Sequence, residues 1–471
     1  MNTQICIADI ISATQGRILS EVETKFSSVG TDTRKSLSGK LFVALAGENY
    51  DAHDFLNQAI EAGASGLLVH RWNESDNLTN KKVTVILVEN TLTALQQLSK
   101  LRRAQWGKPI IAITGSNGKT TTKEFTAQIL SLYKKVHYNQ GSFNNHWGLP
   151  LTLLDLKPDH DIAICEMGMN HSGEIQTLVE IAQPNIVGVT MVGRAHLEGL
   201  GSIEAVAKAK EEIYFTKNNN ITTGIFNMDN HWTKLMKSKF ISASTRTLTF
   251  SSIDSKNDVY FNIEKMNFDE LIIRGHIKGI SGRTNVPIFG LQNLTNLMFA
   301  SCVGLAVGLS PEQIWKSLSL CTTTWGRNQR LIHPSGTEIL FDGYNANPDS
   351  QAALIENLKA MNTNRPIIGV FGEMRELGSH SAKLHEELGS LVSTFNFTDI
   401  YFVGNFGEDF KRGLNRKNEN KHFLNFKNYS EVNSFLIDSL KSHFETKPII
   451  TVKGSRGVKL EKILKELALI N

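Results

Sequence analysis

Cysteines are few in this chain, and long apolar runs are absent. The 471 residues include 4 cysteines, which are too far apart for the paired spacing of a metal site. Cys6, Cys165, Cys302 and Cys321 each have apolar or small neighbours, as buried free thiols do, which favours the reducing cytoplasm. No apolar run reaches about 18 residues, so no membrane span is predicted. The segment 1–12 lacks the basic start and long apolar stretch of a signal peptide.

A large excess of charge of one sign is also lacking. The formal net charge is +4, with 20% charged and 41% hydrophobic residues, as in an ordinary globular protein with sizeable cores. No basic run is interleaved with aromatic residues, so neither nucleic acid nor a membrane surface is an expected partner. At roughly 150 residues per domain, the length allows about three domains.

Alternating strand and helix patterns divide the chain into three α/β units. Residues 1–105 predict a small α/β domain, residues 106–325 a central domain with a parallel sheet, and residues 326–471 a doubly wound, Rossmann-like domain. Residues 250–290 alternate apolar and polar side chains, which predicts an antiparallel meander inserted in the central domain. The predicted strands are 40–45, 66–69, 83–88, 110–113, 162–165, 186–191, 224–226, 338–341, 366–371, 399–403 and 448–452.

The strongest motif is a glycine-rich turn between the strand 110–113 and a helical pattern over 120–132. The usual phosphate-binding pattern would have glycine at Ile113, so this loop is a shortened variant. A Gly-Lys-Thr tripeptide alone also suits a plain turn, but the strand and helix around it favour nucleotide binding. Backbone N–H groups converge at such a helix start, Lys119 can reach the outer phosphates, and the Thr120 hydroxyl can bind Mg²⁺. The predicted ATP-binding residues here are Gly115, Ser116, Asn117, Gly118, Lys119, Thr120 and Thr121.

Polar residues follow the predicted strands of the central domain, at the sheet edge where ligands bind in open parallel sheets. Glu166 ends one strand like the acid that helps hold Mg²⁺ in phosphate-loop enzymes, although a helix-entry Glu explains it equally well. His196 follows the next strand, and a lone His is more often a structural residue than a ligand. On spacing alone, Lys210 is a solvated helix lysine.

Loops in the outer domains carry further polar clusters. In the third domain, four loops at one predicted sheet edge indicate a site for a polar, charged substrate. In the first domain, the polar segments 31–34 and 47–53 are candidates for ligand binding, but solvated loops explain them as well. The third-domain loops are 342–348, 372–378, 404–405 and 453–457.

In this order, the motifs resemble the Mur ligases of peptidoglycan synthesis. The resemblance spans all three predicted domains and rests on 115–121, Glu166, 195–198, 209–213, Asn293 and 326–327. The segments 31–34, 41–45, 344–348, 372–378 and 453–457 are similar to the members that add D-alanyl-D-alanine to a UDP-N-acetylmuramoyl-tripeptide. The Asp-Asn-Pro-Arg-like motif of the members that add diaminopimelate or lysine is absent from the sequence.

The resemblance implies a role for each matching residue. Thr120, Glu166 and His196 correspond to Mg²⁺ ligands, and Lys210 to a lysine whose carbamate faces a second Mg²⁺. Asn293 is implied on the adenine side of ATP, and Arg327 and Asp342 on its phosphate and ribose. Lys119, Lys210 and His196 are the implied catalytic residues. The substrate-binding candidates are Thr33, Arg34, Asn144, Asn145, Asn345, Asn347, Arg375, Ser455 and Arg456, and the choice between Asn144 and Asn145 stays open.

The resemblance also implies the reaction: a cytoplasmic, monomeric ligase that uses ATP to activate a carboxylate for attack by an amine. Hinges are expected near residues 106 and 326, because reactants held on three domains must be brought together. The alternatives are a related ligase that adds diaminopimelate, lysine or folate-linked glutamate, a nucleotide-dependent switch protein, and a generic kinase. Intact Lys119, Glu166, His196 and Lys210 argue against a switch protein. The polar strand ends of the third domain argue against a kinase.

Overall fold

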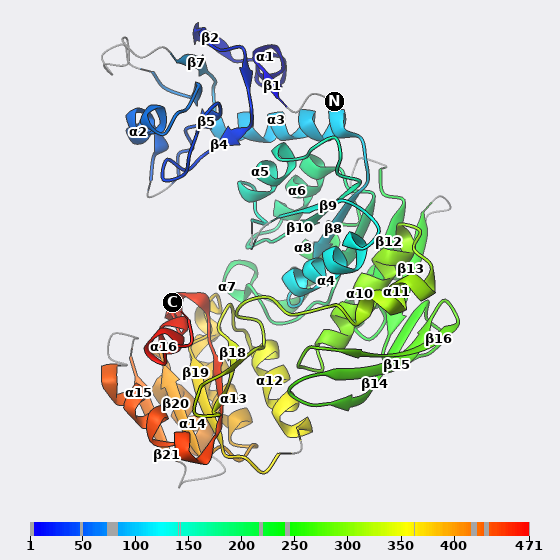
Figure 1. Ribbon diagram of the computed structural model, residues 1–471, viewed down its shortest axis with the longest axis vertical. Coiled ribbons are helices and arrows are strands. Elements are labelled where there is room, and N and C mark those ends of the chain that lie inside the picture. The colour runs from blue at the N-terminus through cyan, green and yellow to red at the C-terminus, as the bar shows by residue number, and fades with distance from the viewer. Residues whose placement is uncertain are drawn as a thin grey trace.

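The computed structural model describes residues 4–47, 50–72, 83–139, 141, 143–215, 220–240, 245–361, 363–415, 422–427 and 433–470. Three α/β units follow one another along its longest axis, with the N-terminal sheet at one end and the C-terminal sheet at the other (Figure 1). The predicted fold class is confirmed. Within the described ranges, no helix is long and apolar enough to span a bilayer.

The first unit is built on a five-stranded sheet of order β2-β7-β6-β5-β4 within the described part of the chain. The helix α3 (Thr91–Trp106) leads out of it and packs on α5 and α6 of the central unit. Asn90 caps α3 by accepting a hydrogen bond from the N–H of Thr93 at 2.9 Å, and Gly107 ends it at φ 69°. The other elements are β1 (Ile5–Cys6), α1 (Ile7–Thr14), β2 (Arg17–Ser20), β3 (Lys25–Phe26), β4 (Val29–Gly30), β5 (Leu41–Val43), η1 (Ala52–Phe55), α2 (Leu56–Glu61), β6 (Gly66–Val69) and β7 (Thr84–Leu87).

The central unit has a nine-stranded sheet among the described residues, in the order β16-β15-β14-β13-β12-β11-β8-β10-β9. Its strands are β8 (Ile110–Thr114), β9 (Val136–Tyr138), β10 (Ile162–Glu166), β11 (Ile186–Val189), β12 (Thr223–Asn227), β13 (Arg246–Ser251), β14 (Val259–Met266), β15 (Leu271–Ile277) and β16 (Ile280–Val286). All five residues of β8 are buried, because helices cover both faces of the parallel part of the sheet. The helices are α4 (Lys119–Ser131), α5 (Gly148–Leu154), α6 (Glu174–Ala182), α7 (Leu197–Leu200), α8 (Ile203–Glu211), α9 (His231–Lys239), α10 (Asn293–Ala306) and α11 (Pro311–Leu318).

The predicted meander is antiparallel only from β14 onward. β13 pairs in parallel with both β12 and β14, so residues 250–251 belong to the parallel sheet. The alternation of side chains is the same in both kinds of strand and does not reveal the direction of the partner. The strands β14, β15 and β16 of the meander therefore extend one edge of the nine-stranded central sheet.

The third unit carries a six-stranded sheet in the described residues, of order β17-β18-β22-β19-β20-β21. Its four predicted strands are confirmed as β18 (Glu338–Asp342), β19 (Ile367–Gly372), β20 (Asp399–Val403) and β22 (Ile449–Lys453). The remaining elements are β17 (Gln329–Ile332), β21 (His422–Phe426), α12 (Pro348–Ala360), η2 (Gly378–His380), α13 (Ser381–Val392), α14 (Gly407–Asn415), α15 (Asn433–Ser442), η4 (Phe444–Thr446), η5 (Arg456–Val458) and α16 (Glu461–Glu466). The helical pattern over 458–469 predicts a longer final helix than α16, since the 3-10 turn η5 takes up the start of that segment.

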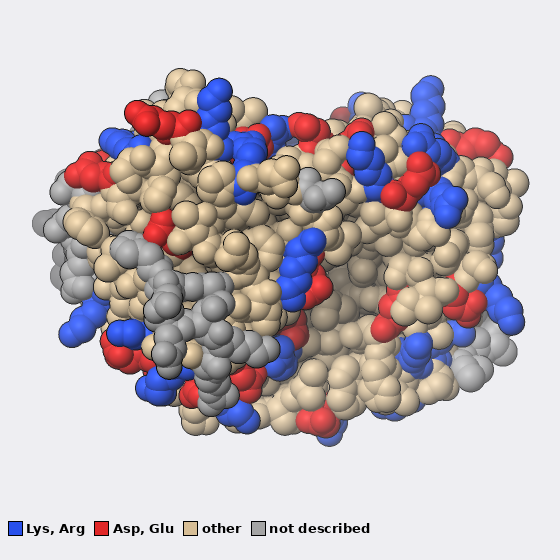
Figure 2. All heavy atoms as spheres, turned by 90° about the horizontal axis from the view of Figure 1, so that it is seen from below, with Lys and Arg blue, Asp and Glu red and all other residues tan. Residues whose placement is uncertain are grey.

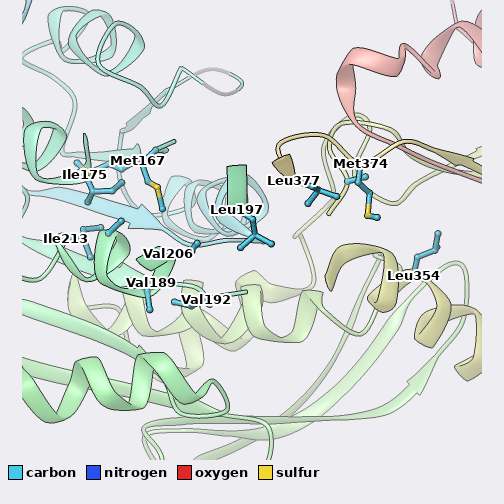
Figure 3. Packing of buried hydrophobic residues seen from close by; sticks show 14 of the residues in the cluster. Met167, Ile175, Val189, Val192, Leu197, Val206, Ile213, Leu354, Met374 and Leu377 are labelled. Atoms are coloured by element: carbon cyan, nitrogen blue, oxygen red, sulfur yellow. The ribbon is translucent and has the colours of Figure 1, made fainter. Parts of the chain in front are cut away.

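Apolar side chains connect the central and third units. One cluster of buried residues includes Leu197 and Val206 of the central unit as well as Leu354, Met374 and Leu377 of the third. Figure 3 shows Leu197 on α7 at this junction, with Leu377 on the opposite side. Gly326, at the start of the third unit, has φ 71°. The packing sets the polar strand ends of the two sheets against each other.

The surface is hollowed between two lobes when the molecule is seen from below, and basic and acidic side chains are mixed over this face (Figure 2). Cys165, Cys302 and Cys321 are buried free thiols as expected, and Cys6 is a half-buried one.

Candidate active site

The glycine-rich turn joins β8 to α4 and is held against the end of β11. The N–H of Ser116 donates to the carbonyl of Met191 at 2.8 Å, and the Thr190 hydroxyl donates to the carbonyl of Asn117 at 2.6 Å. The Ser116 hydroxyl donates to the carbonyl of Gly193 at 3.0 Å. The turn is therefore fixed before any ligand binds, with the N-terminus of α4 directed at its concave side.

Two glycines of the turn cannot be replaced by residues with a side chain. Gly115 has φ 152° and Gly118 has φ 82°, both outside the range of ordinary L-residues. A Cβ on Gly115 would lie 1.9 Å from Oγ1 of Thr190, and one on Gly118 would lie 2.3 Å from Oδ1 of Asn296. Close packing around the turn thus explains why glycine stands at both positions.

A cavity of 490 Å³ lies over this turn, between the central and third units. It is lined by predicted residues of both units, so the two sheet edges do meet at one site, although Lys210, Arg375, Ser455 and Arg456 are not in its lining. Its lining includes Ser116, Asn117, Gly118, Lys119, Thr120, Thr121, Asn144, Asn145, Glu166, His196, Asn293, Arg327, Asp342, Asn345 and Asn347.

Lys119 and Thr120 already have partners at the floor of the cavity. Nζ of Lys119 donates to the carbonyl of Gly115 at 2.8 Å, and burial lowers the pKa of this amine. Nη2 of Arg327, from the third unit, donates to Oγ1 of Thr120 at 2.8 Å. A guanidinium group therefore sits on the hydroxyl predicted to bind Mg²⁺, and it has to move for an ion to take that position.

Three buried polar atoms at this site lack hydrogen-bond partners. They are Oε2 of Glu166, Nδ1 of His196 and Nζ of Lys210. Leaving a buried polar group unsatisfied costs about 1–3 kcal/mol, so such groups are rare and need an explanation. Carboxylate oxygens and imidazole nitrogens are metal ligands, and an unpartnered set of them is what an ion-binding site looks like without its ion.

Lys210 lies at the end of α8 with its side chain fully buried. The solvated position that its spacing alone predicted is wrong, because Val206 and Lys210 are one turn apart on the buried face of the helix. Burial, together with the nearby positive charge of Lys119, lowers the pKa of Lys210 well below its ordinary value. This environment favours an uncharged, nucleophilic amine.

His196 approaches Glu376, which lies just before η2. Nδ1 of His196 lies 2.9 Å from Oε2 of Glu376, but the carboxylate is off the direction that a hydrogen bond requires. The pKa of His196 is lowered, mainly by burial, and the pKa of Glu376 is lowered by its contact with His196. The contact crosses the junction between the two units.

Side chains of the third unit line the opposite wall. Asn347 caps α12 by accepting from the N–H of Ser350, and its Nδ2 donates to Oδ1 of Asn117 in the phosphate loop at 2.8 Å. The guanidinium of Arg327 stacks over the ring of Tyr344, with 4.4 Å between them. Asp342 forms an ion pair with the buried Lys453.

Arg375, Ser455 and Arg456 lie together but outside the lining of this cavity. The Ser455 hydroxyl accepts from the N–H of Arg375 at 3.0 Å and donates to the carbonyl of Ala346 at 3.3 Å, so it stabilises the loops. Arg456 stacks on Trp325, with 4.7 Å between its guanidinium carbon and the ring centre. Arg456 also lies 6.0 Å from the ring of Tyr344, which lines the 490 Å³ cavity, so its guanidinium group is close to that lining.

A second, larger cavity of 1150 Å³ lies between the first and central units. Thr33 and Arg34 line it together with Tyr138 and Trp147. Arg34 forms a bidentate ion pair with Asp32, whose pKa is thereby lowered to about 2. Asn145 lines both cavities and is their common wall.

Asn144 and Asn145 differ in how their side chains are used. Nδ2 of Asn144 donates to Oε1 of Glu166 at 2.7 Å and so orients that carboxylate. Oδ1 of Asn145 accepts from the N–H groups of Trp147 and Gly148 and so stabilises the start of α5. Both residues line the 490 Å³ cavity, so the choice of substrate contact between Asn144 and Asn145 stays a prediction.

The segment 47–53 was a candidate for ligand binding, and residues 48 and 49 of it lie outside the described residues. In the rest of the segment, His53 makes contacts within the fold. Nδ1 of His53 lies 2.7 Å from Oδ1 of Asp51, and Nε2 accepts from the N–H of His70 at 3.1 Å. Both ring nitrogens are used within the fold, so the nearby trio Asp51, His53 and His70 does not offer a ligand set.

Comparison with known proteins identifies the family. The model described as the Mur ligase middle domain matches residues 113–304, and the Mur ligase, glutamate ligase domain matches residues 326–456. The Mur ligase family, catalytic domain, matches residues 25–103. A UDP-N-acetylmuramoyl-tripeptide–D-alanyl-D-alanine ligase of Bacillus subtilis (strain 168) is 35% identical over 464 residues, which covers 98% of this chain and 97% of the relative.

The chain belongs to the Mur ligase family.

Solved Mur ligase structures have the same architecture. A crystal structure of MurF from Acinetobacter baumannii gives a TM-score of 0.86 at 30% identity and covers 98% of each chain. MurF ligase from Thermotoga maritima, in complex with ADP, gives a TM-score of 0.77 at 24% identity over 94% of this chain and 98% of that one, which shows the fold. The resemblance predicted from the motifs of the sequence is confirmed.

Glu376 and Lys453 are among the residues of this Mur ligase site that were not predicted individually. They lie in the predicted polar loops 372–378 and 453–457. No periodicity marks either residue, because each lies in the site through a long-range contact, to His196 and to Asp342 respectively. Only an apolar strand ending in a lysine hinted at Lys453, which is 1% exposed.

Proposed function

We propose that this Mur ligase uses ATP to join D-alanyl-D-alanine to a UDP-N-acetylmuramoyl-tripeptide in peptidoglycan precursor synthesis. The relative from Bacillus subtilis that has this activity in its name is 35% identical over 98% of the chain. The observation that carries the proposal is the 490 Å³ cavity, where a phosphate loop, the unpartnered buried atoms of Glu166 and His196, and the polar edge of a second sheet meet. A ligase needs such a joint site because it activates one reactant and must present the other.

The chemistry starts from a carboxylate, which is a poor acyl donor because its charge repels nucleophiles and oxide is a poor leaving group. ATP phosphorylates the terminal carboxylate of the tripeptide and leaves as ADP, which gives an acyl phosphate. The free amine of D-alanyl-D-alanine then attacks the acyl carbon, an amide bond forms, and phosphate and a proton are released. ADP in the related Thermotoga maritima MurF structure supports the choice of nucleotide.

The phosphate loop handles the charge of the transferred group in this proposal. The N–H groups of 115–121 and the ammonium of Lys119 stabilise the phosphates and the charge that develops during transfer. Asn293 meets the adenine side, Arg327 a phosphate and Asp342 the ribose. Because Lys119 is held on the carbonyl of Gly115, its Nζ only has to swing from that oxygen to an incoming phosphate.

The residues present suit a divalent cation. The Thr120 hydroxyl, Glu166 and His196 would hold Mg²⁺, and the buried Oε2 of Glu166, which has no hydrogen-bond partner, supports this assignment. The amine of Lys210, once uncharged, would attack CO₂: the N–C bond forms as one C=O π bond opens onto oxygen, the amine proton passes to water, and the resulting carbamate anion would hold a second Mg²⁺. Bound Mg²⁺ supplies neutralisation of phosphate charge and orientation of the transferred group.

The outer domains bring the two other substrates in this proposal. Residues 1–105 hold the sugar nucleotide in the 1150 Å³ cavity, with Thr33 and Arg34 as contacts. Residues 326–471 present D-alanyl-D-alanine, with Asn345, Asn347, Arg375 and Arg456 as candidates and Ser455 as their support. Residues 106–325 hold ATP. The protein acts as a monomer in the cytoplasm, where its free thiols stay reduced.

Phosphate release from ATP tests the proposal, measured with UDP-N-acetylmuramoyl-tripeptide in the presence and absence of D-alanyl-D-alanine. We expect release that requires both, together with loss of the free dipeptide amine. Release with a UDP-N-acetylmuramoyl-dipeptide plus diaminopimelate or lysine, and none with D-alanyl-D-alanine, would assign the preceding ligation instead. Tripeptides ending in diaminopimelate and in lysine, compared in parallel, identify the third residue accepted.

A further inference from the structure

The contact between His196 and Glu376 is the only one in which an acidic side chain of the third unit reaches a proposed metal ligand, among the described residues. Nδ1 of the ring lies 2.9 Å from Oε2 of the carboxylate. The side chain of His196 is 16% exposed and that of Glu376 is 53% exposed. Both residues line the 490 Å³ cavity. The pair thus lies at the mouth of the site, on the line where the two units meet.

The backbone around this contact is specially shaped on both sides. His196 has φ 57° and Glu376 has φ 63°, and such left-handed conformations cost non-glycine residues about 1–3 kcal/mol. The N–H of Glu198 donates to the carbonyl of Glu376 at 3.1 Å. A Cβ on Gly378 would lie 3.1 Å from Cα of Glu198, so the two loops touch backbone to backbone. These contacts fix the place of the carboxylate relative to the ring.

A neutral imidazole has one N–H and one lone pair, and its neighbours decide which nitrogen carries the proton. The negative charge of a carboxylate 2.9 Å from Nδ1 favours the proton on that nitrogen, although the pair is not aligned as a hydrogen bond. Within the described ranges, no hydrogen bond engages Nε2 of His196, which lines the 490 Å³ cavity, so the lone pair of this nitrogen stays free for an ion. Metal-binding histidines commonly have a carboxylate or carbonyl on their second nitrogen in this way.

We propose that Glu376 is a positioning residue, delivered by the third unit, that holds His196 in the tautomer able to bind a divalent cation through Nε2. The inference rests on the proposed function only for the identity of the ion. Its consequence is that the metal site is complete only while the loop 375–378 is docked on 195–198. Docking of the third unit and binding of the ion then reinforce each other, as linked equilibria must.

The tautomer of His196 tests the proposal directly. In the protein labelled with ¹⁵N-histidine, the His196 signals are assigned by their loss in His196→Gln. We expect the ring proton on Nδ1 in the native protein. In Glu376→Ala we expect the proton to shift toward Nε2, and in Glu376→Gln, whose amide oxygen can still accept, to remain largely on Nδ1. An unchanged tautomer in Glu376→Ala would overturn the proposal.

Ion affinity gives the second readout, measured by titration of Mn²⁺ followed by electron paramagnetic resonance. Loss of a carboxylate behind a metal-binding histidine weakens binding about 10–100-fold, so we expect such a loss in Glu376→Ala and a smaller one in Glu376→Gln. The matched control is Glu387→Gln, which removes a different charge pair across the same junction, 3.4 Å from Arg194, without touching His196. Equal losses in Glu387→Gln and Glu376→Ala would assign the effect to loosened docking and overturn the proposal.

Tighter Mn²⁺ binding in Glu376→Ala would also overturn it, because Glu376 would then compete with the ion for His196. Neither readout uses D-alanyl-D-alanine. If the native protein binds Mn²⁺ with the expected tautomer but releases no phosphate with that dipeptide, the proposed substrate is wrong and the role of Glu376 stands. Circular dichroism of each variant confirms that the fold is intact.

Discussion

The two cavities of this Mur ligase differ in how their polar side chains are partnered. On the wall of the 1150 Å³ cavity, the exposed Arg34 side chain forms a bidentate ion pair with Asp32. In the lining of the 490 Å³ cavity, Glu166 and His196 each have a buried atom without a hydrogen-bond partner, and glycines with little space for a side chain form the floor. The first arrangement suits binding, and the second suits chemistry.

Only the arrangement in the smaller cavity is expected to lower the stability of the folded protein. Unsatisfied buried groups weaken the folded state until their ligands arrive, whereas paired groups at an exposed rim are close to neutral. Substitutions in the smaller cavity are therefore expected to change turnover, and those in the larger cavity to change substrate affinity.

The largest effect is expected from Lys119→Ala. Removing the ammonium that meets the transferred phosphoryl group should lower kcat by roughly 10³-fold or more, with the fold intact. Phosphate release under saturating substrates measures this effect. Lys135→Ala, which removes an exposed lysine that pairs with Asp159, serves as the control. Undiminished turnover in Lys119→Ala would refute the assignment of the site.

Lys210→Met should separate activity from stability. Methionine fills the space of a fully buried side chain whose amine has no partner. We expect activity to fall by roughly 10²-fold or more and the free energy of unfolding to rise by about 1–3 kcal/mol. Urea denaturation measures the second quantity. A variant that loses both activity and stability would show that Nζ makes a stabilising interaction in solution. Loss of native activity in CO₂-depleted buffer, restored by bicarbonate, would support the carbamate.

Arg34→Ala should affect binding alone. Because Arg34 lines the larger cavity and is remote from the phosphate loop, its loss removes an interaction made equally in the ground and transition states. We expect KM for the sugar nucleotide to rise by about 10-fold while kcat changes less than about 2-fold. A proportional fall in kcat would remove the distinction between the two cavities.

The smallest effect is expected from pH, at His137 on the wall of the larger cavity. Burial lowers the pKa of His137 below its ordinary value of 6.5, so the unfolded chain takes up a proton that the folded chain refuses. Stability should therefore be fully present above about pH 6.5 and fall as the pH drops below that value. Urea denaturation from pH 7.5 to 5, in the native protein and in His137→Gln, measures how much of the fall in stability comes from His137. An equal slope in both would place the effect elsewhere.

Much of the fold could be predicted because its parallel strands are buried on both faces. Apolar runs such as 110–113 and 399–403 therefore stand out, and β8 and β20 lie where they were expected. Short or polar strands did not stand out, and β17 and β21 were missed. The local pattern also predicted Lys210 on the solvent-facing side of its helix. Its four-residue spacing from the apolar Val206 could have indicated the buried face.

The site was predictable as far as strand ends and motifs determine it. Glu166, Asn293 and Arg327 line one cavity as the resemblance implied. The contact of Glu376 with His196 depends on two left-handed backbone positions and on docking of separate units, which no local pattern encodes. Hinges near 106 and 326 stay a prediction, with left-handed glycines at 107 and 326.

Asn145 lines both cavities, and under the proposed function this shared wall would set the length of substrate that can react. A precursor anchored by its nucleotide in one cavity has to cross this wall to bring its free carboxylate to the phosphate loop. Each residue of an extended peptide adds about 3.3–3.6 Å. A stem one residue short would stop before the reacting atoms even if every contact at its anchored end were made. Discrimination among precursors would then come from reach, with no need for a pocket that recognises the last side chain.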